Sequence, residues 1–421
     1  MPWSGSLLPC HPAVAENQPT TKNRMHKELS SFAARLCGAI RGRDAALRRP
    51  VGAARGPYQD LKFNSFALEL FTLQFQHNTA YRKICEARGQ TPGTIEHWTQ
   101  IPAVPTATFK ELELTCLMPP ERTAVFHSSG TTEQKPSRHF HNAESLAVYA
   151  SSLWPWFEQN VLSDLRSTIY DLRLLCLTPP PAQAPHSSLI HMFETVRQKM
   201  GGASVPASRA EYCGQIAPDG SWTLDFDAVL AALDSSRVTR HPSLLLGTAF
   251  SFVHLLDYLA ENNLRLQLPA GSRVMETGGY KNRSRSMPKA ELHALITERL
   301  GVPDENIICE YGMSELSSQA YDCVASDAWR VAGKGDASRH LSPVTCHFEF
   351  PPWARVQIVS PETGREVADG EAGLIRVYDL ANVFSVMAVQ TEDLGVRRGD
   401  GFELIGRARF AEPRGCSLMS A

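Results

Sequence analysis

Small hydroxylated residues and glycine are concentrated in residues 128–132 (Ser-Ser-Gly-Thr-Thr), and Lys135 follows shortly after them. Such a stretch cannot pack a core, but its backbone N–H groups and hydroxyls can surround a polyphosphate. Glycine lets the backbone approach a ligand closely, and the lysine adds a flexible positive charge. An ordinary Ser/Thr/Gly turn explains the stretch about as well. The choice between these interpretations depends on the segments that follow.

Three further polar segments occur in order along the chain. They are residues 277–279 (Thr-Gly-Gly), residues 311–315 (Tyr-Gly-Met-Ser-Glu) and residues 391–395 (Thr-Glu-Asp-Leu-Gly). The third segment is followed by Gly406 and Arg407. The first two stand at the end of short apolar runs that are typical of buried strands. Ligands of parallel sheets bind beyond the carboxyl ends of the strands, so both segments are placed where a ligand would lie.

Short apolar strands alternate with helices through the middle of the chain. The pattern predicts strands at residues 172–177, 243–246, 273–277 and 307–311, and helices at 142–160, 187–200, 222–233, 248–261 and 288–300. From residue 344 the pattern becomes alternating, which predicts a small antiparallel barrel or sheet with strands at 347–350, 354–359, 373–379 and 402–404. The predicted fold is therefore α/β, with a mostly parallel sheet flanked by helices.

The first 57 residues differ in composition from the rest. Lysine and arginine outnumber acidic residues there and aromatic residues are few, which predicts a disordered or loosely helical extension. Residues 27–40 have the spacing of an amphipathic helix. A transit peptide fits this composition, although we favour a dispensable cytosolic tail. The predicted divisions are this extension at 1–57, an α/β core at 58–343, a β subdomain of the same core at 344–405 and a hinge-like tail at 406–421.

The overall composition argues against several classes of protein. The chain has 421 residues and a formal net charge of −2, which does not indicate nucleic acid or an acidic membrane surface as a partner. Its longest apolar runs, such as residues 243–256, are too short and too interrupted to form a transmembrane helix. The 10 cysteines lack C-x-x-C pairs and zinc spacing, so we predict reduced thiols and a cytoplasmic location.

The order and spacing of the four polar segments resemble the acyl-adenylate-forming superfamily, which includes acyl-CoA ligases, peptide-synthetase adenylation domains and luciferase. Within that superfamily the chain is most similar to the acyl-protein synthetases of the LuxE family. This closer resemblance covers about residues 62–419 and is carried by residues 101–110, 128–139, 179–189, 276–285 and 414–418. It implies an adenylate-forming core with ATP and Mg²⁺ at its active site.

The resemblance implies how the nucleotide would be held. The β- and γ-phosphates would be embraced by Ser128, Ser129, Gly130, Thr131, Thr132 and Lys135. The adenine would lie against Gly278 and Gly279 with Tyr311 stacked on it, in a nucleotide site that includes Gly312 and Met313.

The resemblance also assigns roles around the reacting groups. Thr131 or Ser314 would reach the α-phosphate, and Glu315 would hold Mg²⁺ as a hard oxygen ligand. Asp393 would accept hydrogen bonds from the ribose hydroxyls, and Arg407 would lie near ribose or phosphate. The resemblance also implies that His191 lies beside the substrate carboxylate. Other interpretations stay open: Tyr311 could be a core tyrosine, Asp393 a turn cap and Glu315 a solvated helix residue. His191 could equally be a hydrogen-bonded helix histidine without a role in the reaction.

The sequence departs from the superfamily pattern in two regions. Glu133 stands where many relatives have glycine, and the order Lys135-Pro136 is reversed, so the placement of the lysine over the γ-phosphate stays open. Glu392 replaces the glycine between Thr391 and Asp393, which LuxE-like proteins tolerate.

The second region is the C-terminal end of the sequence. Acyl-CoA ligases continue into a further domain of roughly a hundred residues that bears a catalytic lysine, and we expect this chain to lack it. Cys416 lies instead in residues 414–417 (Arg-Gly-Cys-Ser), where Arg414 would lower the pKa of the thiol. By resemblance to the LuxE family, Cys416 is the predicted acyl acceptor. A spare cysteine on a tail is the alternative.

The predicted function is ATP- and Mg²⁺-dependent adenylation of a carboxylic acid, expected to be a long-chain fatty acid. The acyl group would then pass to Cys416 as a thioester and onward to a partner such as an acyl-protein reductase. One alternative is a free-standing adenylating enzyme that delivers the acyl group to coenzyme A, a carrier protein or an amine. Another is a non-catalytic nucleotide-binding subunit. The sequence does not predict acyl chain length, oligomeric state or a link to bioluminescence.

Overall fold

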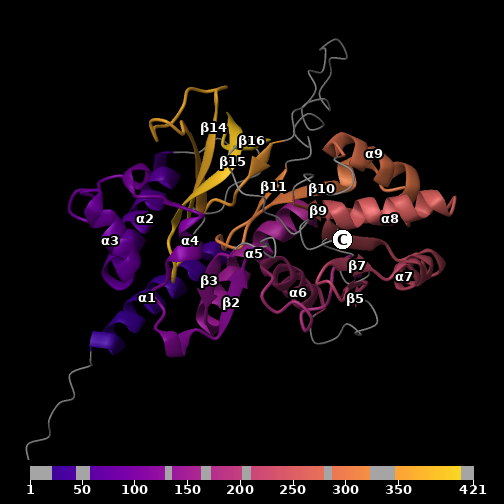
Figure 1. Ribbon diagram of the computed structural model, residues 1–421, viewed down its shortest axis with the longest axis horizontal. Coiled ribbons are helices and arrows are strands. Elements are labelled where there is room, and N and C mark those ends of the chain that lie inside the picture. The colour runs from indigo at the N-terminus through magenta and orange to yellow at the C-terminus, as the bar shows by residue number, and fades with distance from the viewer. Residues whose placement is uncertain are drawn as a thin grey trace, which may run out of the picture.

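A twelve-stranded sheet with helices on both faces forms the framework of the described residues (Figure 1). The computed structural model describes residues 21–43, 57–128, 135–162, 172–201, 210–278, 287–322 and 347–408. Along the sheet the strands are ordered β5-β4-β8-β9-β10-β11-β12-β16-β15-β14-β13, and β1 pairs with β15. The predicted α/β fold, with helices flanking the sheet, is confirmed.

The first five strands in this order are parallel. They are β5 (Ala210–Tyr212), β4 (Arg173–Cys176), β8 (Ser243–Thr248), β9 (Arg273–Thr277) and β10 (Ile307–Tyr311). Strands that are buried on both faces read as continuous apolar runs, and this is why the sequence predicted four of them. Their carboxyl ends lie at one edge of the sheet, where the predicted nucleotide segments begin.

Helices cover this parallel part on both faces. Leu244 and Leu246 of β8 pack into the core beneath α5 (Ala143–Val161) and α6 (Ser188–Gly201). Leu245 points to the opposite face, into a core formed with α7 (Phe226–Thr239), α8 (Ala249–Glu261) and α9 (Lys289–Leu300). Successive residues of one strand therefore fill two separate cores, as the pleat requires.

Side-chain caps fix where these helices begin. Asn142 caps α5 by accepting a 2.8 Å hydrogen bond from the Ser145 amide, and Thr248 caps α8 by accepting one of 3.0 Å from Ser251. The predicted helix at 222–233 was wrong at its start. Residues Trp222–Leu224 form strand β7, paired with β6 (Gly214–Ile216), and α7 begins only after its cap, Asp225.

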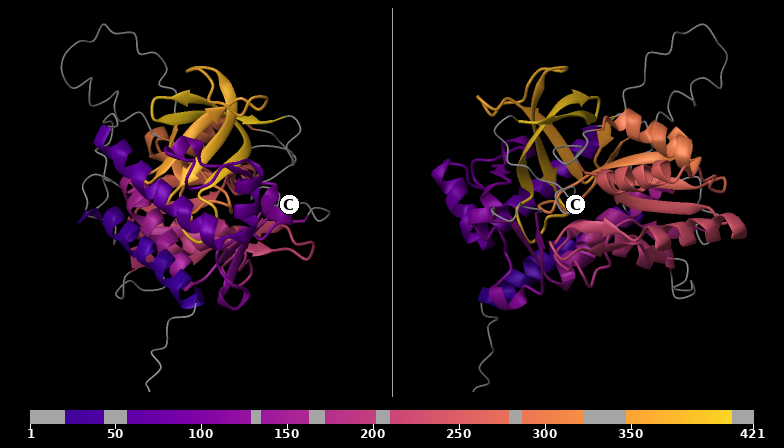
Figure 2. Two further views of the ribbon diagram at one scale, coloured as in Figure 1. Left: turned by 90° about the vertical axis from the view of Figure 1, so that its left-hand side faces the viewer. Right: turned by 45° about the vertical axis from the view of Figure 1, so that its right-hand side comes forward.

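The antiparallel strands continue the same sheet. They are β11 (Ala320–Asp322), β12 (Phe348–Glu349), β13 (Ala354–Val359), β14 (Ala372–Asp379), β15 (Ala388–Arg398) and β16 (Gly401–Arg407). Figure 2 shows the later strands, in yellow, twisting away from the helical part. The predicted strands here are confirmed, and β11 and β15 are additional ones. The join between the parallel and antiparallel parts is the antiparallel pairing of β10 with β11.

The N-terminal region contributes helices to the core. These are α1 (Thr21–Gly38), continued by a π-turn at Ala39–Arg43, then α2 (Pro57–His77) and α3 (Thr79–Ala87). Leu29, Phe32 and Leu36 of α1 are at most 1% exposed, and α1 packs against α2 and α5. The predicted amphipathic helix is present, and because its apolar stripe is buried, residues 21–43 are part of the core rather than a disordered extension. Residues 1–20 and 44–56 lie outside the described part.

Short helices and strands connect the larger elements, and one hairpin lies beside the candidate site. They are η3 (Trp98–Gln100), β1 (Val104–Pro105), α4 (Thr108–Glu111), η4 (Pro119–Glu121), η7 (Asp304–Asn306) and a hairpin of β2 (Ala124–His127) with β3 (Arg138–His141). The hairpin brackets the predicted phosphate-binding stretch. In the described part of the chain, no helix has the length and apolarity needed to cross a membrane.

Candidate active site

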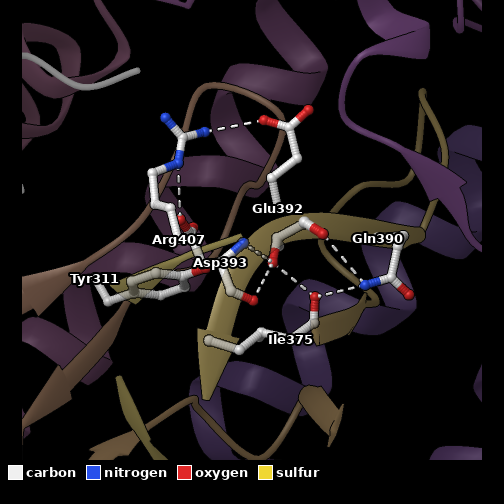
Figure 3. Close-up of polar contacts among 7 residues, drawn as sticks. Tyr311, Ile375, Gln390, Glu392, Asp393 and Arg407 are labelled. Carbon is white, nitrogen blue, oxygen red and sulfur yellow. Dashed lines mark hydrogen bonds and ion pairs between the residues drawn. The ribbon is translucent and has the colours of Figure 1, made fainter. Parts of the chain in front are cut away.

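Tyr311, Asp393 and Arg407 meet although they come from distant parts of the sequence (Figure 3). The Tyr311 hydroxyl donates a 3.0 Å hydrogen bond to Asp393 Oδ2. Arg407 Nε lies 3.3 Å from Asp393 Oδ1, and Arg407 Nη2 donates to Glu392 Oε2 at 3.0 Å. Asp393 and Arg407 are opposite one another in the β15–β16 pair. The structure thus brings together three of the predicted nucleotide-binding residues.

Tyr311 is buried in an aromatic cluster as well as being hydrogen-bonded. Its ring centroid lies 5.2 Å from that of Phe402 and 6.2 Å from that of Phe350, both in edge-on arrangements. Burial, and after it the nearby Asp393 carboxylate, raises the pKa of the Tyr311 hydroxyl well above its usual value. The hydroxyl therefore keeps its proton at neutral pH and remains a donor to Asp393. Stacking of adenine on this ring stays a prediction.

Thr391 holds the backbone around Asp393 in place. Its hydroxyl donates to the Ile375 carbonyl at 2.7 Å and accepts from the Asp393 amide at 3.2 Å. Gln390 Nε2 donates to the same Ile375 carbonyl at 3.1 Å. The threonine of the 391–395 segment is thus an internal brace, and it leaves the aspartate directed toward Tyr311.

The loop after β10 is buried and is held from the antiparallel part of the sheet. Ser314 Oγ donates to Glu315 Oε2 at 2.9 Å, and Asn382 Nδ2 donates to the Glu315 carbonyl at 2.9 Å. Asp379 accepts hydrogen bonds from the amides of Ser317 and Ser318 at 2.9 and 2.8 Å. Glu315 is only 1% exposed, so it is not a solvated helix residue.

The β2–β3 hairpin is tied directly to this loop. His139 Nδ1 donates to the Ser314 carbonyl at 2.7 Å, and Ser137 Oγ lies 3.4 Å from Ser314 Oγ. The Ser137 amide donates to Ser128 Oγ at 2.9 Å, which closes the base of the hairpin. Burial lowers the pKa of His139, so its ring is neutral at pH 7 and carries the donated proton on Nδ1. The predicted phosphate-binding stretch therefore begins next to Ser314.

Other predicted site residues either lie away from the Tyr311–Asp393–Arg407 contact or lie outside the described part. Lys135 forms a 3.3 Å ion pair with Glu111 at the surface, and its side chain is more than half exposed. Gly278 has φ +93°, a conformation that favours glycine, directly after β9. The predicted site residues that lie outside the described part are Ser129, Gly130, Thr131, Thr132, Gly279 and Cys416.

His191 lies on α6 among aromatic rings. Its ring centroid is 5.2 Å from that of Phe126 and 5.3 Å from that of Tyr149. Burial lowers the pKa of His191, which favours the neutral ring at pH 7. This position faces the same side of the sheet as Glu310, the residue before Tyr311. Its predicted place beside a substrate carboxylate stays a prediction.

The sequence matches the model of a known protein family. The model of the LuxE family, described as acyl-protein synthetase, matches residues 50–421. The chain belongs to the LuxE family. The predicted family is thereby confirmed, and with it the assignment of the chain to the ligases.

Two curated LuxE relatives are long-chain-fatty-acid–luciferin-component ligases. The Vibrio harveyi enzyme is 22% identical over 359 residues, which are 83% of this chain and 84% of the relative. The Aliivibrio fischeri enzyme is 25% identical over 210 residues, 47% of this chain, and the match spans only 50% of the relative. Among solved structures, 2-hydroxyisobutyryl-CoA ligase with 2-HIB-AMP and CoA has a TM-score of 0.58 at 13% identity, covering 87% of this chain and 73% of that one. That likeness confirms the adenylate-forming fold.

Five site residues were not singled out from the sequence of this LuxE protein. Four of them support the loop after β10, namely Ser137, His139, Asp379 and Asn382, and the fifth is Glu310. Glu310 had a usable signal, because an acidic residue inside the apolar run of a buried strand is costly unless it has a role. The four supporting residues had none, because each contacts backbone or a hydroxyl far away in the sequence.

The residues around Glu315 fit a magnesium ion. Among the described residues no group of three or more His, Cys, Asp or Glu side chains is positioned to hold a metal by itself. Mg²⁺ at nucleotide sites takes one or two carboxylates and completes its shell with phosphate oxygens and water. A buried carboxylate beside a serine hydroxyl, as in Glu315 and Ser314, matches that donor set.

Proposed function

We propose that this enzyme activates a long-chain fatty acid with ATP and transfers the acyl group to the thiol of Cys416. In the first step a carboxylate oxygen attacks the α-phosphorus of ATP, and pyrophosphate leaves. In the second step the Cys416 thiolate attacks the acyl carbonyl carbon, and AMP leaves while a thioester forms. The convergence of Tyr311, Asp393 and Arg407 beside the Ser314–Glu315 loop is the observation that carries this proposal.

The side chains are suited to holding a nucleotide in a fixed orientation. Asp393 accepts from ribose hydroxyls while the Tyr311 hydroxyl and Arg407 keep its carboxylate oriented. The hairpin base at Ser128 and Ser137 lies beside Ser314, whose hydroxyl would reach the α-phosphate. Such pre-oriented donors stabilise the charge that develops as pyrophosphate leaves.

Glu315 would hold a magnesium ion in this site. The ion, when bound, neutralises charge on the phosphates. Ser314 orients the Glu315 carboxylate through its 2.9 Å hydrogen bond, and Asn382 fixes the Glu315 backbone. These contacts hold the carboxylate at one place in a buried loop, as a metal ligand requires.

The acid, the acceptor and the location follow from chemistry and from the relatives. Both curated relatives are named for long-chain fatty acids, which supports that class of substrate. An acyl-protein reductase is the partner that would consume the thioester. We place the reaction in the cytoplasm because thiols stay reduced there, and the cysteines within the described residues, Cys37, Cys85, Cys116, Cys176, Cys213 and Cys309, are all free.

Two linked assays test the proposal. Fatty-acid-dependent ATP–pyrophosphate exchange reports the first step, and labelled acyl transfer to the protein reports the second. Cys416→Ser is expected to keep exchange and lose acyl-protein, while Cys10→Ser, which lies outside the family match, keeps both. Acyl-protein formed by Cys416→Ser would refute the acceptor, and would favour an enzyme that uses another acceptor. Absence of exchange with every acid tried would refute activation, and would favour a nucleotide-binding subunit.

A further inference from the structure

A row of polar side chains crosses the carboxyl edge of the sheet on the face covered by α5 and α6. Tyr321 of β11 is paired with Glu310 of β10, and Glu310 is paired with Thr277 of β9. Paired residues of neighbouring strands project from the same face of a sheet. We call these three residues the polar row. On this face the preceding side chains of β9 and β10, Met275 and Ile308, belong to the apolar core, so polar groups beside them are costly unless they are paired.

The polar row is buried and only partly hydrogen-bonded. Tyr321 is 0% exposed and Glu310 5%. The Thr277 hydroxyl donates to the Glu310 carboxyl, and Gln319 Nε2 donates to the Tyr149 hydroxyl at 3.1 Å just above the row. The Tyr321 hydroxyl and Gln319 Oε1 make no hydrogen bond with any described residue. Leaving such groups unpaired costs about 1–3 kcal/mol each, which natural sequences avoid unless a ligand or water pairs them.

The position of the row relates it to the acid substrate. Glu310 and Tyr311 are consecutive in β10, so their side chains point to opposite faces at the same strand end. Both residues lie at the end of β10 that leads into the Ser314–Glu315 loop, where the carboxylate of the acid must meet the α-phosphate. Tyr149, which lies over the row, also contacts His191, the residue expected beside that carboxylate. The carbons next to the carboxylate would therefore pass along the polar row.

We propose that the polar row, with Gln319, binds a hydroxyl group on the acid substrate, close to its carboxylate. This inference rests on the proposed function and narrows it from fatty acids to hydroxylated ones. A hydroxyl donates one hydrogen bond and accepts others. It donates to the Glu310 carboxyl or to Gln319 Oε1 and accepts from the Tyr321 hydroxyl. An ammonium group cannot accept a hydrogen bond from Tyr321, and a methylene group would leave the Tyr321 hydroxyl and Gln319 Oε1 without a partner.

The Glu310 environment supports this assignment. Burial raises the pKa of Glu310 to about 7, and its bond from Thr277 opposes the rise. A carboxyl of this kind accepts from a hydroxyl when ionised and donates to it when protonated. Gly312 contributes by leaving room, because a β-carbon there would overlap the Glu310 carboxyl. Burial and then the Glu310 carboxylate also raise the pKa of Tyr149, so that hydroxyl stays protonated.

The test compares matched acids on the full-length chain. Hexadecanoic, 2-hydroxyhexadecanoic and 3-hydroxyhexadecanoic acids are assayed for kcat/KM in ATP–pyrophosphate exchange, and their Kd values are measured by calorimetry without ATP. We expect one hydroxy acid to be preferred by about tenfold or more over the plain acid in both measurements. In Tyr321→Phe the preference should fall to about one, while Tyr81→Phe, a buried tyrosine outside the row, keeps it.

The outcomes separate this inference from the proposed function. Tyr321→Phe removes no hydrogen bond between described residues, so it is expected to fold, and Glu310→Gln provides a second variant. Equal use of plain and hydroxylated acids by the wild type, or an unchanged preference in Tyr321→Phe, would overturn the inference and leave only water in the row. If none of the acids supports ATP–pyrophosphate exchange, the proposed function is refuted. The Kd values from calorimetry would still show whether the polar row binds a hydroxyl group.

Discussion

The Tyr311 hydroxyl donates a 3.0 Å hydrogen bond to Asp393 Oδ2 and so links the last residue of parallel strand β10 to antiparallel strand β15. Arg407 Nε approaches the other oxygen of the same carboxylate at 3.3 Å. A carboxylate held from both sides is already oriented, so the Asp393 side chain loses little conformational entropy when a ligand hydrogen-bonds to it. The contact also means that a nucleotide at this site would bridge the two parts of the sheet.

Removing the Tyr311 hydroxyl should weaken nucleotide binding. Tyr311→Phe keeps the ring in its aromatic cluster and frees one oxygen of Asp393, so we expect KM for ATP to rise about tenfold, or about 1.4 kcal/mol, with little change in Tm. Asp393→Asn should cost at least as much, and the double variant should cost less than the sum because the two residues act together. Pyrophosphate-exchange kinetics measure all three. Strictly additive effects would show that the hydrogen bond does not orient Asp393. The control is Tyr258→Phe, in α8, where the tyrosine ring stacks on Phe226 away from the site.

Asp379 should matter for stability. It is 0% exposed and accepts hydrogen bonds from the Ser317 and Ser318 amides and from the Ser318 hydroxyl at 2.7 Å. Asp379→Ala leaves these donors buried without an acceptor, so we expect a loss of roughly 3 kcal/mol in the free energy of unfolding. Urea denaturation measures it, and Asp369→Ala on an exposed turn should change the midpoint little. A loss below about 1 kcal/mol would mean that the loop finds other acceptors.

The hairpin contact through His139 should affect turnover more than folding. His139→Phe keeps an aromatic ring beside Phe109 but loses the 2.7 Å hydrogen bond to the Ser314 carbonyl. The loop that carries Ser314 and Glu315 is then less well placed against the phosphates, so kcat for exchange should fall about tenfold or more while Tm shifts by only a few degrees. His97→Phe, at an exposed cap, is the control. A fall confined to Tm, with kcat intact, would assign His139 to packing alone.

The sequence was informative where chemistry requires a fixed residue type at a fixed strand end. Tyr311, Asp393 and Arg407 belong to such segments, and the structure brings them into contact. The sequence was uninformative where a residue supports the site through backbone atoms, as Asp379 and His139 do, because many residue types and spacings offer that contact.

Two errors in the predicted fold have physical causes. The amphipathic spacing of α1 was predicted, but its burial was not, because that burial depends on α2 and α5 and cannot be seen in local composition. Residues 222–224 carry apolar side chains that fit a strand or a helix, and their pairing with β6 decided the outcome. Strand β15 was also not predicted, because the consecutive polar residues 391–393 interrupt the apolar alternation that indicates a strand.

Glu310 should make stability fall as pH rises through neutrality. Its pKa is raised by burial from 4.5 to about 7, so the folded state binds a proton that the unfolded state releases. The contribution of Glu310 to the free energy of unfolding is fully present below pH 4.5 and is lost as pH rises through 7. The total loss is on the order of 3 kcal/mol. Glu310→Gln is neutral at every pH, so the stability difference between wild type and variant isolates this contribution, since other titrating groups cancel.

Urea unfolding at pH 5, 6, 7 and 8 measures that difference. The wild type should lose stability relative to Glu310→Gln across this range, and most steeply between pH 5 and 7, because there the two states differ most in bound protons. Glu298→Gln, at an exposed ion pair with Arg265, should run parallel to the wild type. Parallel curves for Glu310→Gln would mean that Glu310 is ionised in the folded protein at pH 5, and hence that a partner stabilises its charge. A hydroxylated acid bound to the polar row should lower the pKa of Glu310 by donating to its ionised form, and so flatten the wild-type curve.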